Sequence, residues 1–184
     1  GANVKVFDNE LYRLRRLQEH LGGKIFTSTI QPNILAEALR TCDVAIGALR
    51  GESGRSPVVV TEKMVMQMKP NSIIIDVSID QGGVFETSEI TNHKNPIFKK
   101  HDVIHYCVPN ITARVSRSAS YALSNIFTPF LNDMSNYGGF HELLKIAKGF
   151  RHGVYIYKGN LVNDSLAKKF GMKYKDLDLM MNLY

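Results

Sequence analysis

The sequence has no tryptophan and few cysteines, and its apolar runs are short. Only two cysteines, Cys42 and Cys107, occur among the 184 residues. Each lies in or next to an apolar run, which indicates reduced, buried thiols and excludes a disulfide framework. No apolar run is long enough to span a bilayer, and no signal-peptide pattern is present. We therefore expect a cytoplasmic protein that has no membrane partner.

Charge of one sign is not concentrated in any part of the chain. The 23 Lys and Arg residues outnumber the 17 Asp and Glu residues and give a net charge of +6, but the two kinds are interspersed. Basic patches with interleaved aromatic residues are typical of nucleic-acid binders, and no such patch is visible, so nucleic acid is not expected as a partner. The six histidines show no metal-ligand spacing, so the sequence predicts no metal site.

Short apolar runs alternate with helical patterns as far as Asn110. Extended runs are predicted at 4–7, 25–26, 43–48, 73–75 and 103–108. The apolar spacing of a helix is found at 11–21, 34–39 and 61–68. The connection through Asn95 and Pro96 has no regular pattern. Strands that alternate with helices are typical of βαβ units, so we predict an α/β fold with a partial, Rossmann-type parallel sheet.

The pattern changes after Asn110. A long amphipathic helix is predicted at 118–134, and Pro129 is expected to kink or interrupt it. Shorter elements are predicted after it at 141–147, 153–157 and 165–170. These elements do not make a complete core by themselves. We therefore assign them to part of a second domain, or to a dimer surface.

The stretch 72–83, SIIIDVSIDQGG, has the pattern most typical of a functional site. Its apolar run is typical of a strand covered on both faces, and in such sheets ligands lie at the carboxyl ends of the strands. Asp76 and Asp80 follow this run, with Gly82 and Gly83 after them. Carboxylates placed there can relay protons or stabilise a developing positive charge. Asp and Gly are also ordinary turn residues, so a capped turn explains the pattern equally well.

Asp8 ends the first extended run and is followed by a helical pattern. A carboxylate in this place accepts hydrogen bonds from adenosine ribose hydroxyls in dinucleotide-binding sheets. Methyltransferases place an acid similarly, and a helix N-cap also requires one. The glycine-rich turn expected about twenty residues earlier is not within this chain. The loop 50–57 lacks the Lys and Ser/Thr of a phosphate loop, so we expect a flexible loop beside the site.

Asn110 follows the last extended run of the sheet. Its amide can donate to a cofactor or substrate carbonyl, and a simple turn residue after Pro109 is the other interpretation. Three serines nearby, Ser116, Ser118 and Ser120, have no adjacent base, so a nucleophilic serine has little support.

Several stretches together resemble one family. The strings GANVKVFD, DVAIGA, MKPNSIIIDVSIDQGGVFE, NPIFKKHDVIHYCVPN and SYALSN resemble the C-terminal half of alanine dehydrogenase, from Gly1 to about Ala147 and more loosely to the end. DQGG and HYCVPN, in this order and at this distance, are specific. The nucleotide-binding domain of proton-translocating transhydrogenase shares this ancestry and is the close alternative. A truncated, non-catalytic nucleotide-binding or oligomerisation module is the alternative from another class.

The resemblance implies an NAD-dependent oxidoreductase that interconverts L-alanine with pyruvate and ammonium. Residues 1–112 would form an NAD-binding Rossmann-like domain without its first strand and glycine-rich loop. Residues 113–184 would supply the long inter-domain helix and the C-terminal part of an incomplete catalytic domain. Hexamers are common in the family, so a homo-oligomer is also implied. The family's catalytic His lies in the N-terminal half, so we expect the isolated chain to be inactive.

The resemblance also assigns roles to single residues. Asp80 would be the catalytic carboxylate near the nicotinamide, and Asp8 would bind the adenosine ribose. The other cofactor-binding residues would be Ala48, Leu49 and Val77 along the cleft, with Val108, Asn110 and Ile111 against the nicotinamide. One departure affects the hinge between the domains: the stretch 110–120 reads NITARVSRSAS and lacks the prolines usual in the family.

Overall fold

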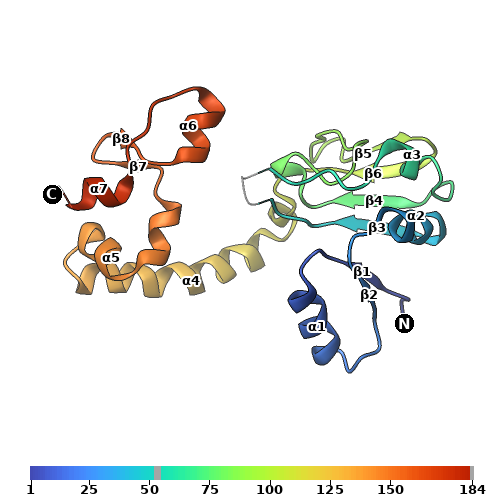
Figure 1. The fold of residues 1–184 in the computed structure, drawn as a ribbon, viewed down its shortest axis with the longest axis horizontal. Coiled ribbons are helices and arrows are strands. Elements are labelled where there is room, and N and C mark those ends of the chain that lie inside the picture. The colour runs from blue at the N-terminus through green and yellow to red at the C-terminus, as the bar shows by residue number, and fades with distance from the viewer. Residues whose placement is uncertain (52–54, 183–184) are drawn as a thin grey trace. The chain divides into compact units, whose positions relative to one another are not determined.

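A computed structural model describes residues 1–51 and 55–182. The chain forms two compact units, Gly1–Ile111 and Thr112–Tyr184 (Figure 1). The fold is α/β, as the sequence predicts, with parallel strands connected by helices in the first unit. Residues 52–54 of the predicted loop 50–57 lie outside the described residues.

The first unit contains the elements expected of βαβ connections, followed by a hairpin. In chain order they are β1 (Lys5–Phe7), α1 (Leu11–His20), β2 (Phe26–Ser28), α2 (Pro32–Thr41), β3 (Val44–Gly47), α3 (Glu62–Val65), β4 (Ile73–Asp76), the 3₁₀ turn η1 (Ile79–Gln81), β5 (Ile97–Lys100) and β6 (Val103–Tyr106). A second 3₁₀ turn, η2 (Ile111–Val115), follows. The helices and the strands other than β5 overlap the predicted positions, with α3 shorter than predicted, and the two 3₁₀ turns were not predicted.

The strands of the first unit form two sheets. A four-stranded sheet has the order β3-β4-β6-β5, and β1 and β2 make a separate parallel pair. β3, β4 and β6 are parallel to one another, which confirms the predicted parallel sheet. The carboxyl ends of these strands therefore lie at one edge of the sheet, where ligands bind in folds of this type.

The segment around Asn95 and Pro96 is not wholly irregular, so that prediction is wrong for β5. This strand pairs antiparallel with β6, through a turn at His101 and Asp102. Both turn residues have left-handed backbones, with φ of 52° and 61°, which a tight hairpin requires. The lysines at the end of β5 conceal the strand pattern, because edge strands commonly carry charge.

The core of the first unit lies on one face of the four-stranded sheet. Side chains alternate along β3, so Ala45 is buried while Ile46 next to it is exposed. Ile74 of β4 is fully buried, and α2 and α3 contribute Leu39 and Val65 to the same cluster. Full burial of an Ile, Leu or Val side chain stabilises the fold by about 1.5–3 kcal/mol. These two helices therefore cover one face of the sheet and hold its strands in register.

The second unit consists of helices and one small hairpin. Its elements are α4 (Ser116–Asn136), α5 (Phe140–Ile146), the 3₁₀ turn η3 (Lys148–Gly153), β7 (Ile156–Tyr157), β8 (Asn160–Leu161), α6 (Asp164–Phe170) and α7 (Leu177–Asn182). A small core joins Leu144, Val154, Tyr157, Val162, Leu177, Met180 and Met181. The unit therefore packs mainly through its second half.

The long helix α4 continues through Pro129, so the interruption predicted there does not occur. Proline removes one N–H bond to the carbonyl four residues earlier, on Asn125. Asn125 is exposed, so water can satisfy that carbonyl. No residue of α4 is buried, and Phe130 packs against Phe150 with the ring centres 4.1 Å apart. Across residues 1–51 and 55–182, neither α4 nor any other helix has the length and apolar character needed to cross a membrane.

Candidate functional site

Asp80 and Asn110 lie together although thirty residues separate them in the sequence. Asp80 is in η1, just after β4, and Asn110 follows β6, the neighbouring parallel strand. The backbone N–H of Asn110 donates to both carboxylate oxygens of Asp80, each at 3.2 Å. Asn110 has φ of 52°, a left-handed conformation that asparagine tolerates better than most residues. The DQGG and VPN stretches therefore form one site at the carboxyl edge of the sheet.

Asp76 has a different role from Asp80. It is only 2% exposed, and its carboxylate accepts hydrogen bonds from the N–H groups of Ser78 (3.1 Å) and Val84 (2.8 Å). The Ser88 hydroxyl donates to it at 2.6 Å. These bonds close the turn after β4, so the capping interpretation holds for Asp76. The carboxylate of Asp80 is exposed at the edge of the sheet, where a ligand can reach it.

The paired glycines are required by this turn. Gly82 and Gly83 have φ of 102° and 82°, which side-chain-bearing residues rarely adopt. A Cβ atom on Gly83 would lie 2.7 Å from Oδ2 of Asp76. A Cβ atom on Gly82 would lie 3.3 Å from Nε of Arg55. The glycines therefore let the chain fold closely around Asp76 and place Arg55 beside the turn that carries Asp80.

Two serines that the sequence analysis did not single out join the ends of β3 and β4. The carbonyl of Leu49 accepts from the hydroxyls of Ser56 (2.8 Å) and Ser78 (2.7 Å). The N–H of Ser56 donates to the carbonyl of Gln81 at 2.8 Å. Both serines are buried. A serine in a turn is too common to have predicted this connection. The two hydroxyls nevertheless hold the segment after β3 against the turn after β4.

The other predicted cofactor residues follow the same strands. Ala48 is exposed after β3, Leu49 is half-buried, and Val77 after β4 is 39% exposed. Val108 is only 3% exposed, so its backbone rather than its side chain is available to a ligand. Ile111 is half-buried next to Asn110.

Asp8 lies at the carboxyl end of β1, in the separate strand pair. Oδ1 accepts from the N–H of Glu10 at 2.8 Å, which closes a turn before α1. Oδ2 lies 3.7 Å from the guanidinium of Arg13, and 23% of the side chain is exposed. The carboxylate thus helps to start the helix, and its exposed part retains lone pairs that can accept from hydroxyl groups.

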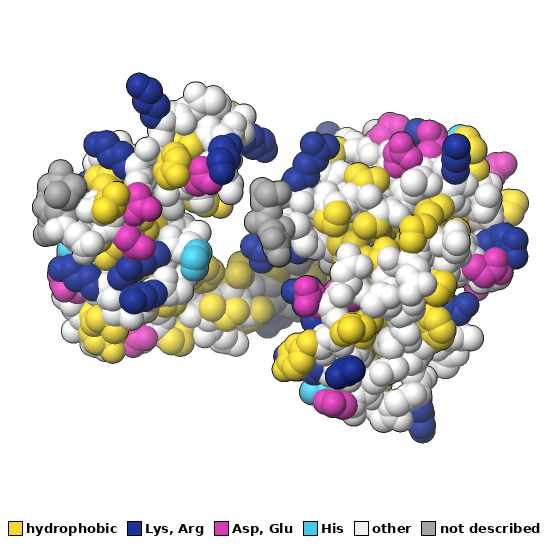
Figure 2. Space-filling view, viewed as in Figure 1, with side chains coloured by type: hydrophobic (Ala, Val, Ile, Leu, Met, Phe, Trp, Pro, Cys, Tyr) yellow, Lys and Arg dark blue, Asp and Glu magenta, His cyan; other side chains and the backbone are white. Residues whose placement is uncertain are grey.

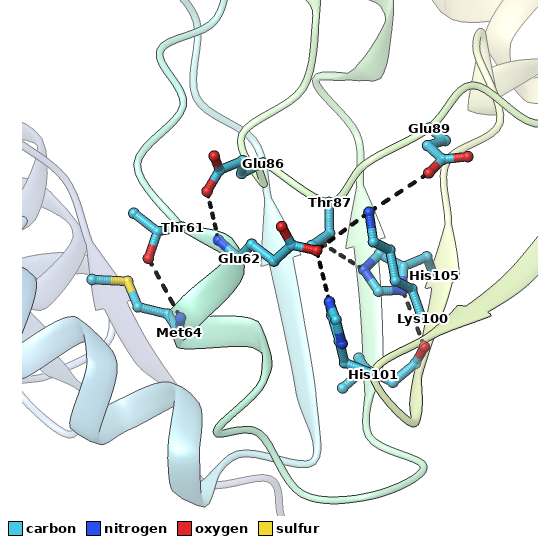
Figure 3. Close-up of polar contacts among 10 residues, drawn as sticks. Thr61, Glu62, Met64, Glu86, Thr87, Glu89, Lys100, His101 and His105 are labelled. Atoms are coloured by element: carbon cyan, nitrogen blue, oxygen red, sulfur yellow. Dashed lines mark hydrogen bonds and ion pairs between the residues drawn. The ribbon is translucent and has the colours of Figure 1, made fainter.

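A second polar cluster surrounds Glu62, at the end of β6 opposite to Asn110 (Figure 3). His101 Nε2 lies 2.7 Å from Oε1 of Glu62, and Lys100 Nζ lies 3.4 Å from the same oxygen. The hydrogen bond to His101, and then the charge of Lys100, lower the pKa of Glu62 below its ordinary value. Oε2 of Glu86 accepts from the Glu62 N–H at 2.7 Å. This cluster ties α3 to the β5–β6 turn and lies away from the site at Asp80.

His105 lies beneath this cluster and is fully buried. Its Nδ1 lies 3.1 Å from the Val103 carbonyl, which can only accept, so Nδ1 donates and Nε2 accepts from the Thr87 hydroxyl at 2.8 Å. Burial lowers the pKa of this imidazole. The ring also stacks on Phe98, with centres 4.8 Å apart. His105 is therefore a neutral core residue rather than a catalytic one.

The lowered pKa of Glu62 predicts a pH dependence of stability. The folded state favours its charged form, so this stabilisation is present above the pKa in the unfolded chain and is lost as the pH falls through the folded-state pKa. We expect the Glu62→Gln variant to lose less stability than the original chain between about pH 5 and about pH 3. Urea unfolding at each pH measures this difference. Glu19→Gln, an exposed change on α1, is the control, and equal losses in all three proteins would contradict the prediction.

Most of the chain matches a known protein family. A family model described as "Alanine dehydrogenase/PNT, C-terminal domain" matches residues 1–164. The chain belongs to this family. Alanine dehydrogenase 2 of Staphylococcus aureus (strain MRSA252) is 36% identical over 184 residues, which are 100% of this chain and 49% of the relative. The chain thus spans about half the length of the curated relatives it matches.

Solved structures show the same relationship. An L-alanine dehydrogenase superposes with a TM-score of 0.82 at 30% identity, over 93% of this chain and 47% of that chain. A transhydrogenase from Sinorhizobium meliloti superposes with a TM-score of 0.67 at 23% identity, over 90% and 43% of the two chains, and so shares the fold. The resemblance to the C-terminal half of alanine dehydrogenase is therefore confirmed. The chain is part of an oxidoreductase family whose Rossmann-like domain binds pyridine nucleotides.

Proposed function

We propose that the chain is the C-terminal portion of a cytoplasmic, NAD-dependent alanine dehydrogenase. The enzyme would convert L-alanine, NAD and water to pyruvate, ammonium and NADH. The observation that carries this proposal is the junction of Asp80 with Asn110 at the carboxyl ends of β4 and β6, in a chain of this family. By itself the chain is expected to be inactive, because it spans about half of its relatives.

The residues around this edge fit a dinucleotide. Asp8 offers a partly exposed carboxylate for the ribose hydroxyls, and its negative charge would repel the additional phosphate of NADP. Ala48 is small and exposed, so a planar group can approach the backbone after β3. Val77 adds an exposed apolar surface after β4. Bound NAD would accept a hydride from the α-carbon of alanine.

Asp80 would act on the substrate side of this step. Loss of the hydride leaves a positively charged imine carbon, to which water adds before ammonium departs. A fixed carboxylate stabilises the positive charge and can take a proton from the attacking water. Asn110 holds that carboxylate through both oxygens, which orients it for these tasks. Asn110 is therefore assigned a positioning role through its backbone.

Subunit contacts are proposed for α4. Its exposed apolar side chains include those of Tyr121, Leu123, Ile126, Phe127 and Leu131. An exposed apolar stripe of this length is typical of an interface. We assign it to contacts between subunits of a homo-oligomer, a hexamer being common in the family.

The test is NAD reduction by the intact product of the gene, with L-alanine, glycine or no amino acid. Turnover with L-alanine and NAD, but not with NADP, is expected. Asp8→Ala should weaken NAD binding by about 1–3 kcal/mol and reduce the discrimination against NADP, because the ribose hydroxyls lose a charged acceptor. Arg13→Ala is the matched control for the loss of the Asp8 ion pair alone. A folded protein that reduces neither cofactor with any amino acid would reject the dehydrogenase and leave a non-catalytic module.

A further inference from the structure

The turn that carries Asp80 is closed by its own backbone. The carbonyl of Ser78 accepts from the N–H groups of Gln81 at 2.9 Å and Gly83 at 3.0 Å. Neither bond uses the Ser78 hydroxyl, which donates instead to the carbonyl of Leu49 at 2.7 Å. The shape of the turn therefore does not depend on this hydroxyl. The hydroxyl determines where the turn lies relative to the end of β3.

The carbonyl of Leu49 connects the segment after β3 to this turn by two routes. The first is the direct bond from the Ser78 hydroxyl. The second passes through Ser56, whose hydroxyl donates to the same carbonyl at 2.8 Å and whose N–H donates to the Gln81 carbonyl at 2.8 Å. A carbonyl oxygen has two lone pairs, so the two hydroxyls occupy both of them. Removal of either hydroxyl therefore leaves one route intact.

The position of Asp80 depends on this connection. The Asn110 N–H is shared between both oxygens of its carboxylate, and each distance of 3.2 Å is at the long end of the hydrogen-bond range. This shared bond orients the carboxylate but restrains its position only weakly. Ala48 and Leu49, which are assigned to the cofactor, lie at the other end of the connection. Reaction geometry tolerates little error, since a displacement of about 1 Å costs about 100-fold in rate.

We propose that Ser56 and Ser78 are positioning residues for Asp80. Through the Leu49 carbonyl, their hydroxyls hold the turn at a fixed distance from the cofactor-binding segment, so that the carboxylate lies beside the nicotinamide. Both serines are buried, so they act through Asp80 and not on the substrate. The inference rests on the proposed dehydrogenase function.

The test uses the intact product of the gene, with L-alanine and saturating NAD. Ser56→Ala and Ser78→Ala should each lower kcat by less than about threefold, because the other route remains. The double variant should lower kcat by at least about 10-fold, because both routes are lost. The Kd for NADH, measured by fluorescence titration, should stay within about threefold in all three variants, because neither serine is assigned to the cofactor.

The matched control is Ser72→Ala. Ser72 is also a buried serine and lies at the opposite end of β4. Its hydroxyl has no hydrogen-bond partner among residues 1–51 and 55–182. This variant makes the same chemical change without removing a hydrogen bond, so kcat should be unchanged. Urea unfolding of every variant confirms that rates are compared between folded proteins.

A double-mutant cycle with Asp80→Asn distinguishes positioning from a purely structural role. In the Asp80→Asn background, loss of both serine hydroxyls should lower kcat by no more than about threefold further, because the carboxylate that they position is already absent. Structural damage independent of Asp80 would lower kcat by the same factor in both backgrounds. If the double alanine variant does not fold, Ser56→Ala is combined with Ser78→Cys. The thiol fills the site and donates only weakly, so kcat should fall further than in Ser56→Ala alone.

The rate of the original protein separates the two possible failures. An original product without turnover rejects the proposed function and this inference with it. With an active original, the inference is overturned if the double variant loses less than about 10-fold in kcat, or if one single variant loses as much as the double variant. An equal loss in the Asp80→Asn background overturns it as well. So does a Ser56→Ala, Ser78→Cys variant that is as fast as Ser56→Ala.

Discussion

Replacement of Asp80 by asparagine in the intact gene product is expected to lower kcat for alanine oxidation by at least about 100-fold. Asparagine keeps an oxygen that can accept from the Asn110 N–H, so the local backbone is retained. It removes the negative charge and the basic oxygen to which the proposed mechanism assigns stabilisation of the imine and proton transfer from water. NADH binding should change little, because Asp80 is assigned to the substrate side of the nicotinamide. Steady-state rates and NADH fluorescence titration measure the two effects separately.

The control for this variant is Asp43→Asn in the same unit. The Asp43 side chain is 87% exposed and pairs with Lys69 at the opposite end of β3, so its loss should leave kcat unchanged. The pH profile gives a second readout, because removal of a catalytic base flattens the acidic limb of kcat, whereas a structural change does not. An Asp80→Asn enzyme that keeps a rate within about threefold of the original would remove Asp80 from the mechanism.

Replacement of Asp76 by asparagine should instead destabilise the fold, by about 2–4 kcal/mol. An amide accepts on one side only, so its NH2 group would face either the Ser78 N–H or the Val84 N–H and Ser88 hydroxyl, all of which donate to the carboxylate. At 2% exposure, water cannot replace the lost acceptor. The midpoint of urea unfolding measures the loss.

Asp43→Asn serves again as the control for Asp76, since a surface ion pair contributes only about 0–1 kcal/mol. The two assays should therefore distinguish the two aspartates. We expect Asp76→Asn to lower the unfolding midpoint, and Asp80→Asn to lower kcat at an unchanged midpoint. An Asp76→Asn protein with the original midpoint would show that the turn after β4 does not depend on this carboxylate.

Most elements of the first unit could be predicted from residue patterns, because their strands are short apolar runs and their helices have an apolar stripe. β5 could not, since an edge strand ending in Lys99 and Lys100 does not alternate like a buried one. The sequence predicted the helix α4 but not whether Pro129 would kink or interrupt it, and the structure shows no interruption. The cost of a proline depends on whether water reaches the carbonyl it leaves unpaired, and this depends on the surroundings of the helix.

The sequence by itself determined the α/β class, the family and the importance of the DQGG and VPN stretches, because these depend on local composition and order. Only the tertiary structure decided that Asp76 is buried in the turn and that Asp80 is exposed. Asp76 and Asp80 have the same chemistry and the same kind of turn sequence around them. They differ because the chain from Gly83 to Ser88 folds back over Asp76 and surrounds it with hydrogen-bond donors. Asp80 instead contacts Asn110, which follows another strand. Burial and donors from residues distant in the sequence make the Asp76 carboxylate a structural cap, whereas the Asp80 carboxylate stays exposed at the edge of the sheet.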